Sequence, residues 1–550
     1  MQTRRTSISL AAWFSAALSL AAAPQTAPPG GLSADQVIDR VIATEAEFQR
    51  ELAKYHPVIE TYLQYTDQGP EAKDVLASDA YFFGKVDFGT AFGFDSFKND
   101  SNGGFSVKSW FKKPGFRLLP PGFVKMAALD PNGLSRDNYV FENLQSEFVG
   151  EVRCWVVDVT PKDKEGRFIG RIWAEDRDFH IVRYSGTYGS KQLVRYFHFN
   201  GYRRQMGPGL WMPSAVYVEH AYEQHKSGPL PRGLKAQVHL WSYGVSGAPK
   251  TSTFTNIQIE TPEPAKDRSA TDVSSTEALR QWRQEAEENV IARMEKAGLI
   301  APEGEMEKVL DAVLNNLIVT NKVVASPLPR CRILLTTPLE SCSIGNTIVL
   351  SRGLINVLPN EATLAAFIAR ELAHIVQGHS IKTLDAFANR TQVEDSRVLQ
   401  RFRFRRTPEQ EESAIRKAQE LLKNSPYGPE LPSIGLFLAS LSANLKALPN
   451  LLEPNIGNPV ADLKAGVAFK ELLSMSPRLA PEDLRQIPAL PLGSRLRIDA
   501  WDNRAEVLNA KPVAILTADE KLPFEVTPIV VPLRRQAAPT ATVKTGAGGL

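Results

Sequence analysis

Residues 360–379 read NEATLAAFIARELAHIVQGH, and this stretch decides how the chain is interpreted. Asn360 is a favourable N-cap, so a helix is predicted over residues 361–377, ending near Gly378. Its apolar residues recur at helical spacing and form one stripe, at Leu364, Phe367, Ile368, Leu372, Ile375 and Val376. The sequence therefore predicts a buried helix in which Glu371 and His374 are polar exceptions.

Glu371 and His374 have the spacing of the second half of an HExxH motif. In that motif, histidines at i and i+4 project from one helix face onto a zinc ion, and the intervening glutamate polarises the attacked water. The first position of the motif is Arg370 in this chain. An ExxH string alone recurs by chance in long helices, so the residues around it carry more weight.

A strand and a second capped helix flank the motif. The β-branched run from Thr347 to Ser351 is predicted as a strand that leads toward the helix. Downstream, Thr407 and Gln410 form a capping box, with proline at the first helical position. Glu411 falls on the same face as the apolar residues that follow it, so it points inward, where a carboxylate needs a partner.

On these residues, the segment 276–501 resembles the gluzincin metallopeptidases of the CAAX-prenyl-endopeptidase type, in which a strand ending in Gly-Leu precedes HExxH and a later ExxAD helix supplies the third zinc ligand. The resemblance implies that Glu371 is the catalytic glutamate, and that His374 and Glu411 are the second and third zinc ligands. It also matches His379 to an extra histidine of the family motif, and Ala414 to the alanine of ExxAD.

Two departures from the family pattern affect the metal site. Ile415 replaces the aspartate of ExxAD, and Arg370 replaces the first ligand with a guanidinium that has no lone pair for a metal. Of the eight histidines, only His374 and His379 follow residue 239, and His379 lies five positions past His374, a poor helical offset for a substitute ligand. Zinc is therefore expected to bind weakly or not at all, and Arg370 is expected to form a buried ion pair with Glu411.

Composition and the N-terminus give the cellular context. The chain of 550 residues is 43% hydrophobic and carries 64 Lys+Arg against 61 Asp+Glu, a balance too even to favour nucleic acid as a partner. Residues 1–23 have the charged, apolar and small-residue order of a signal peptide, which predicts export to a periplasmic or other extracytoplasmic compartment. Export permits a disulfide between Cys331 and Cys342, although the sequence does not establish one.

The remaining chain is predicted to be α+β. Residues 32–260 read as a helix followed by an antiparallel sheet, 261–275 as a linker, 276–534 as the mainly helical metallopeptidase-like domain with a small sheet, and 535–550 as a disordered tail. The first domain bears a general resemblance to the half-barrels of lipoprotein carriers; the alternative is a sheet that buries its apolar face against its own helix. The basic, aromatic run 401–406 reads as a solvated strand or loop rather than as a nucleic-acid or lipid contact.

Three functions follow from these expectations. The first is an exported metallopeptidase-family protein, catalytically impaired, that acts on or binds envelope polypeptides. The strand residues Thr347, Ile348 and Val349 are expected to form an edge that accepts an extended peptide without a metal. The second is an active zinc endopeptidase with Glu371 as general base. The third is lipid or lipoprotein carriage by the N-terminal sheet, with possible membrane proximity; the oligomeric state is not readable from the sequence.

Overall fold

The computed structural model describes residues 31–68, 74–89, 93–97, 120–130, 133–163, 166–189, 196–221, 233–244, 274–381, 399–453, 456–460 and 466–535. The predicted signal peptide, most of the predicted linker and residues 536–550 lie outside this set. The described residues form a helix and a large antiparallel sheet, followed by a mainly helical part with small sheets, which confirms the predicted α+β class. None of the helices in these ranges is long and apolar enough to cross a membrane.

Helix α1 (Ala34–Leu52) opens the described chain. The Ser33 side chain accepts a hydrogen bond from the Gln36 backbone, and the Gln36 side chain accepts one from the Ser33 backbone, which completes the predicted capping box. Val37, Val41 and Phe48 face inward from this helix. The helical period thus fixes which side of α1 packs on the sheet.

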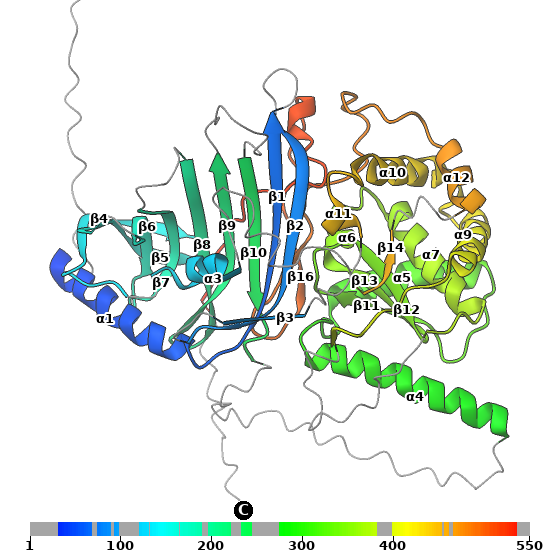
Figure 1. Ribbon diagram of the computed structural model, residues 1–550, viewed down its shortest axis with the longest axis horizontal. Coiled ribbons are helices and arrows are strands. Elements are labelled where there is room, and N and C mark those ends of the chain that lie inside the picture. Colours follow the sequence, from blue (N-terminus) through cyan, green and yellow to red (C-terminus); the bar gives the residue numbers. More distant parts are fainter. Residues whose placement is uncertain are drawn as a thin grey trace, which may run out of the picture.

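The N-terminal sheet is antiparallel and contains ten strands, in the spatial order β3-β2-β1-β10-β9-β8-β7-β6-β5-β4 (Figure 1). Its strands are Val58–Gln68 (β1), Asp74–Asp87 (β2), Gly93–Ser96 (β3), Tyr139–Val149 (β4), Val152–Pro161 (β5), Phe168–Glu175 (β6), Ile181–Tyr188 (β7), Tyr196–Gly207 (β8), Leu210–Ala221 (β9) and Gly233–Trp241 (β10). The sheet begins at residue 58, earlier than the β-rich texture from about residue 81 predicts.

Both faces of this sheet are covered. On one face, α3 (Pro120–Ala128) is held by the Tyr184 and Tyr188 hydroxyls, which donate to backbone carbonyls of residues 125–127 and 129. On the other face, Val531 and Leu533 from the C-terminal segment pack against alternate residues of β4 to β9. Apolar residues of α1 and α3, including Phe48 and Phe123, belong to the same buried core as Tyr184 and Phe199 of the sheet.

The second part of the chain places helices around a small sheet (Figure 1). Its helices are Ser275–Lys296 (α4), Glu305–Thr320 (α5), Arg352–Val357 (α6), Glu361–Val376 (α7), Pro408–Lys423 (α9), Leu431–Asn444 (α10), Pro449–Leu452 (α11) and Gly466–Ser474 (α12), with short 3-10 turns at Gly428–Glu430 and Ala518–Glu520. The small sheet has the order β11-β13-β12-β14, with strands Arg330–Leu334 (β11), Glu340–Ile344 (β12), Thr347–Ser351 (β13) and Asn458–Pro459 (β14). A separate hairpin joins Leu496–Ile498 (β15) to Ala505–Val507 (β16).

A buried polar network joins the two parts. Glu60 on β1 is fully buried, and its carboxylate pairs with the Arg352 guanidinium at 2.6 Å. The same carboxylate accepts hydrogen bonds from the Thr337 backbone at 2.6 Å and from the Tyr81 hydroxyl at 2.8 Å. Because the charges are paired and hydrogen-bonded out of water, this contact fixes β1 against the start of α6.

Candidate functional site

Helix α7 begins and ends as the sequence predicts. The Asn360 side chain accepts a hydrogen bond from the Thr363 backbone at 2.9 Å, and Gly378 after the helix takes the left-handed φ of +68°. The segment from Arg370 to His374 is buried throughout, with Glu371 and His374 fully so. Ionisable groups in such a place require partners, and those partners come from α9, β12 and the loop after α7.

Arg370 pairs with Glu411, as expected from the sequence. Its Nε and Nη2 atoms both donate to Glu411 Oε2, at 2.9 and 2.6 Å, and its Nη1 donates to the Pro459 carbonyl at 3.1 Å. Burial alone would raise the pKa of Glu411, but the Arg370 charge and His374 outweigh it and lower this pKa to about 2. Glu411 is therefore an anion at neutral pH, and its counterion is a guanidinium.

His374 completes this group through both ring nitrogens. Its Nε2 lies 3.3 Å from Glu411 Oε1, and its Nδ1 lies 2.9 Å from His379 Nδ1. His374 Nε2 and Glu411 Oε1 are both buried, and neither makes a hydrogen bond to a described residue.

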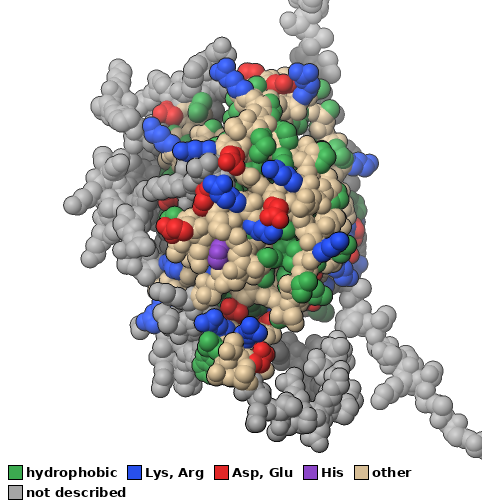
Figure 2. All heavy atoms as spheres, turned by 90° about the vertical axis from the view of Figure 1, so that its right-hand side faces the viewer, with side chains coloured by type: hydrophobic (Ala, Val, Ile, Leu, Met, Phe, Trp, Pro, Cys, Tyr) green, Lys and Arg blue, Asp and Glu red, His purple; other side chains and the backbone are tan. Residues whose placement is uncertain are grey.

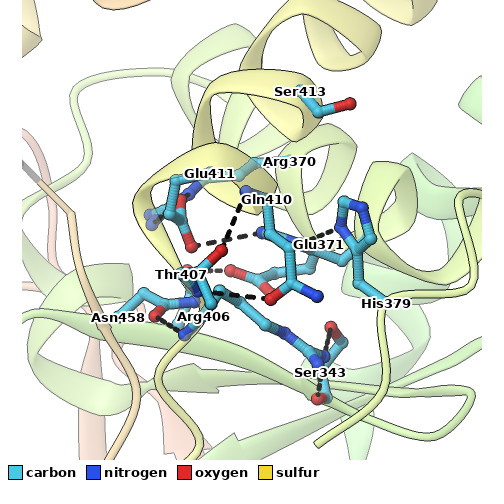
Figure 3. A network of polar contacts seen from close by, with 12 residues as sticks. Ser343, Arg370, Glu371, His379, Arg406, Thr407, Gln410, Glu411, Ser413 and Asn458 are labelled. Carbon is cyan, nitrogen blue, oxygen red and sulfur yellow. Dashed lines mark hydrogen bonds and ion pairs between the residues drawn. The ribbon is translucent and has the colours of Figure 1, made fainter. Parts of the chain in front are cut away.

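Glu371 turns toward the small sheet. The Ser341 hydroxyl on β12 donates to Glu371 Oε1 at 2.6 Å, while Glu371 Oε2 is buried without a hydrogen-bond partner among the described residues. Burial and the nearby Glu371 carboxylate raise the pKa of the Cys342 thiol, which disfavours the thiolate form. Figure 3 shows Arg370 beside Glu411 at one end of the site and His379 at the other.

Arg406 is a site residue that the sequence interpretation missed. Phe402 and Phe404 are buried, and residue 406 lies at the next alternate position, on their face. Its Nη2 donates to the Ser343 carbonyl and hydroxyl at 3.0 and 3.1 Å. The period-2 alternation was the available signal: Phe402, Phe404 and Arg406 face inward, while Arg401 and Arg405 are exposed, so only one side of this run is solvated.

The prediction that Thr347, Ile348 and Val349 form an edge is wrong. Strand β13 pairs with β11 on one side and with β12 on the other, and all its residues are buried. The strand beside the site is β12, which pairs in turn with the two-residue β14. The error has a physical cause: the turn around Gly345 closes a hairpin in which β12 covers one side of β13, and the distant strand β11 covers the other.

The same strand order keeps Cys331 and Cys342 apart. They lie on β11 and β12, on opposite sides of β13, so their backbones are about two strand spacings, roughly 10 Å, from each other. A disulfide needs Cα atoms within about 7 Å. All three cysteines are free and buried.

An apolar cavity of about 50 Å³ adjoins the Arg370–Glu411 pair, between α7, α9, α10 and α12. Ile415, where the family pattern has aspartate, lines it together with Phe367 and Leu438. The other lining residues are Ala366, Ala418, Gln419, Leu422, Ile434, Pro459, Val460 and Leu472. Its walls are therefore apolar except at the ion pair and Gln419.

A family model supports the assignment of this region. Residues 342–403 match the model described as Peptidase family M48. The match supports a metallopeptidase-family domain. A comparison with curated proteins found no match. Among solved structures, a DUF1329 family protein from Desulfovibrio piger is similar to this chain at 12% identity, over 37% of this chain and 90% of that one, with a TM-score of 0.19.

The residues present do not fit the zinc ion that such a domain implies. A guanidinium, which has no lone pair, occupies the first ligand position, and it places its positive charge on Oε2 of the third, Glu411, leaving only Oε1 of that carboxylate without a hydrogen bond to a described residue. Within the described ranges, no group of three or more His, Cys, Asp or Glu side chains could hold a metal ion. The described geometry is an ion pair between α7 and α9, at two positions where the family pattern has zinc ligands.

Proposed function

We propose that this protein is exported and binds envelope polypeptides through a metallopeptidase-family domain that lacks zinc-dependent peptidase activity. The observation that carries the proposal is the ion pair between Arg370 and Glu411. It joins the same two helices that a metal would join, but a guanidinium cannot polarise a peptide carbonyl as a Lewis acid or activate a bound water.

In this protein, Glu371 has a structural role. Its Oε1 accepts from Ser341, so the carboxylate links α7 to β12. Without a metal to lower the pKa of a water molecule, a carboxylate alone is a weak activator of water for amide hydrolysis. Removing the Glu371 charge is therefore expected to change the stability of the domain and to leave peptide cleavage at the background rate.

Polypeptide binding is supported by the apolar cavity next to the ion pair. Strand addition is a less suitable mode, because β14 pairs with β12 at Glu340 and Ser341, and Arg406 occupies the Ser343 carbonyl. An apolar side chain that enters the cavity would be recognised by shape and burial. Figure 2 shows basic and acidic side chains interspersed on the side of the molecule that carries α9 and α12 in Figure 1, which favours apolar recognition over a single-sign electrostatic one.

Export is supported by residues 1–23, which have the charged, apolar and small-residue order of a signal peptide. In an extracytoplasmic compartment, the candidate partners of the domain are unfolded envelope proteins. Fractionation of cells that express the full chain tests this part directly. We expect the protein in the extracytoplasmic fraction; full retention in the cytoplasm would refute export while leaving the proposed loss of peptidase activity unaffected.

Fluorescein-labelled casein tests binding and cleavage with one probe. We expect the full-length protein to raise the anisotropy of the labelled casein and to leave its bands intact on a gel. Glu371→Gln should behave like the natural protein in both measurements. Casein cleavage that disappears in Glu371→Gln and on addition of a zinc chelator would instead establish an active endopeptidase, and an unchanged anisotropy would refute polypeptide binding.

A further inference from the structure

Arg406 brings a second guanidinium next to the residues that match the family's zinc site. Its backbone N–H donates to the Asn458 side chain at 2.9 Å, and its Nη2 donates twice to Ser343, so the side chain is fixed at both ends. Its Nε and Nη1 atoms are buried and donate to none of the described residues. A partly desolvated cation with two unused donors requires a nearby negative charge.

Glu371 supplies much of that negative charge. Burial lowers the pKa of Arg406, and the Glu371 carboxylate is the largest of the opposing effects, followed by the Cys342 thiol, Glu411 and Glu287. Glu371 Oε2 is itself a buried atom without a partner in the described part of the chain. Figure 3 shows Arg406 running beside Glu371 toward Ser343.

Arg406 lies in the same network of polar residues as Arg370, Glu411 and His379 (Figure 3). A divalent cation placed among these groups would meet the positive charge of Arg406 even if Arg370 were absent.

We infer that Arg406 is a second determinant of the metal-free state: Arg370 is the ion-pair partner of Glu411, and Arg406 adds a second positive charge near Glu371 without a direct ion pair. Two guanidinium groups thus lie among the two buried carboxylates without zinc. This inference rests on the loss of zinc binding proposed above and adds a specific consequence. Restoring the first ligand through Arg370→His is not sufficient to restore a zinc site.

Zinc stoichiometry in matched variants tests this inference. The full-length protein, Arg370→His, Arg370→His with Arg406→Gln, and Arg370→His with Arg405→Gln are each stripped of metal, incubated with zinc, dialysed and measured by mass spectrometry. Arg405 is the control because it is an exposed arginine next to Arg406 in the same run. Competition with a chromophoric chelator then gives the zinc Kd.

We expect about one zinc per chain only in the Arg370→His, Arg406→Gln protein, with a Kd at least tenfold lower than in Arg370→His alone or in the Arg405 control. Arg370→His with Arg406→Lys, which keeps the charge, should not gain zinc. If the glutamine double variant fails to fold by circular dichroism, the Arg406→Met version, which keeps the apolar volume, takes its place.

Equal zinc affinity in Arg370→His and in Arg370→His with Arg406→Gln would overturn the role of Arg406. A gain of zinc in the Arg406→Lys double variant would also overturn it. So would the absence of any zinc gain in both the Arg406→Gln and the Arg406→Met double variants. Stoichiometric zinc on the unmodified protein would instead refute the proposed function itself. The two failures are therefore distinguishable.

Discussion

Glu411→Ala should be strongly destabilising, because it leaves the Arg370 guanidinium buried without its counterion. The Arg370 and Glu411 side chains are 10% and 5% exposed, and both Arg370 donors bind the same carboxylate oxygen. Removing one partner of such a pair typically costs about 3–5 kcal/mol. We expect about 3 kcal/mol, the low end, since the bond from Arg370 to the Pro459 carbonyl remains.

The pKa of Glu411 gives the same magnitude independently. This pKa is lowered from its ordinary value of 4.5 to about 2, which corresponds to about 3 kcal/mol of stabilisation at neutral pH. For a carboxylate with a lowered folded-state pKa, the stabilisation is complete above the unfolded pKa and is lost as the pH falls toward the folded one. The difference between the natural protein and Glu411→Ala should therefore shrink to about 1 kcal/mol near pH 3.

Thermal and urea unfolding followed by circular dichroism measure this effect. For a chain of 550 residues, about 3 kcal/mol corresponds to a decrease in Tm of roughly 3 °C. Glu420→Ala is the matched control, because Glu420 lies on the same helix in an exposed pair with Lys417 and should cost less than about 1 kcal/mol. Equal melting temperatures for Glu411→Ala and Glu420→Ala would refute the reasoning.

Three further predictions concern other parts of the molecule. Arg535→Ala removes the ion-pair partner of the fully buried Glu175 and should lower the free energy of unfolding by about 1–2 kcal/mol, with faster proteolysis of the C-terminal segment. An unchanged Tm and digestion pattern would show that this ion pair does not hold the segment on the sheet. Ala418→Phe fills the apolar cavity and should weaken casein binding at least tenfold, whereas Lys423→Phe on the exposed side of α9 should not; equal binding by the two variants would exclude the cavity. None of the three cysteine thiols should react with a disulfide reagent in the native protein at pH 8, and all three should react after unfolding. The reason is that burial raises the pKa of the thiols, that of Cys154 to about 12. A native thiol that reacts rapidly would contradict the buried positions.

The helices were predictable because their determinants are local. A capping residue and an apolar stripe within about 16 residues specify α1, α7 and α9, and the inward direction of Glu411 followed from its register alone. The ion pair followed from a further chemical step, since an inward carboxylate and an arginine in place of a ligand each needed a partner. The sequence therefore predicted the central contact of the site.

Features that depend on distant parts of the chain were not predictable. Strand β1 is buried but contains Glu60, Gln64 and Thr66, and those polar residues hid it. Their partners include Arg352 and the Phe524 carbonyl, which lie 292 and 460 residues away. The position of β13 inside the small sheet likewise depends on pairing with two separate strands, which periodicity does not encode.

The zinc content of the unmodified, full-length protein tests the central claim most directly. The protein is incubated with excess zinc, dialysed and measured by mass spectrometry, beside Glu411→Ala prepared in the same way. Because Arg370 occupies Glu411, we predict less than about 0.1 zinc per chain in both proteins. About one zinc per natural chain, lost in Glu411→Ala, would contradict the account.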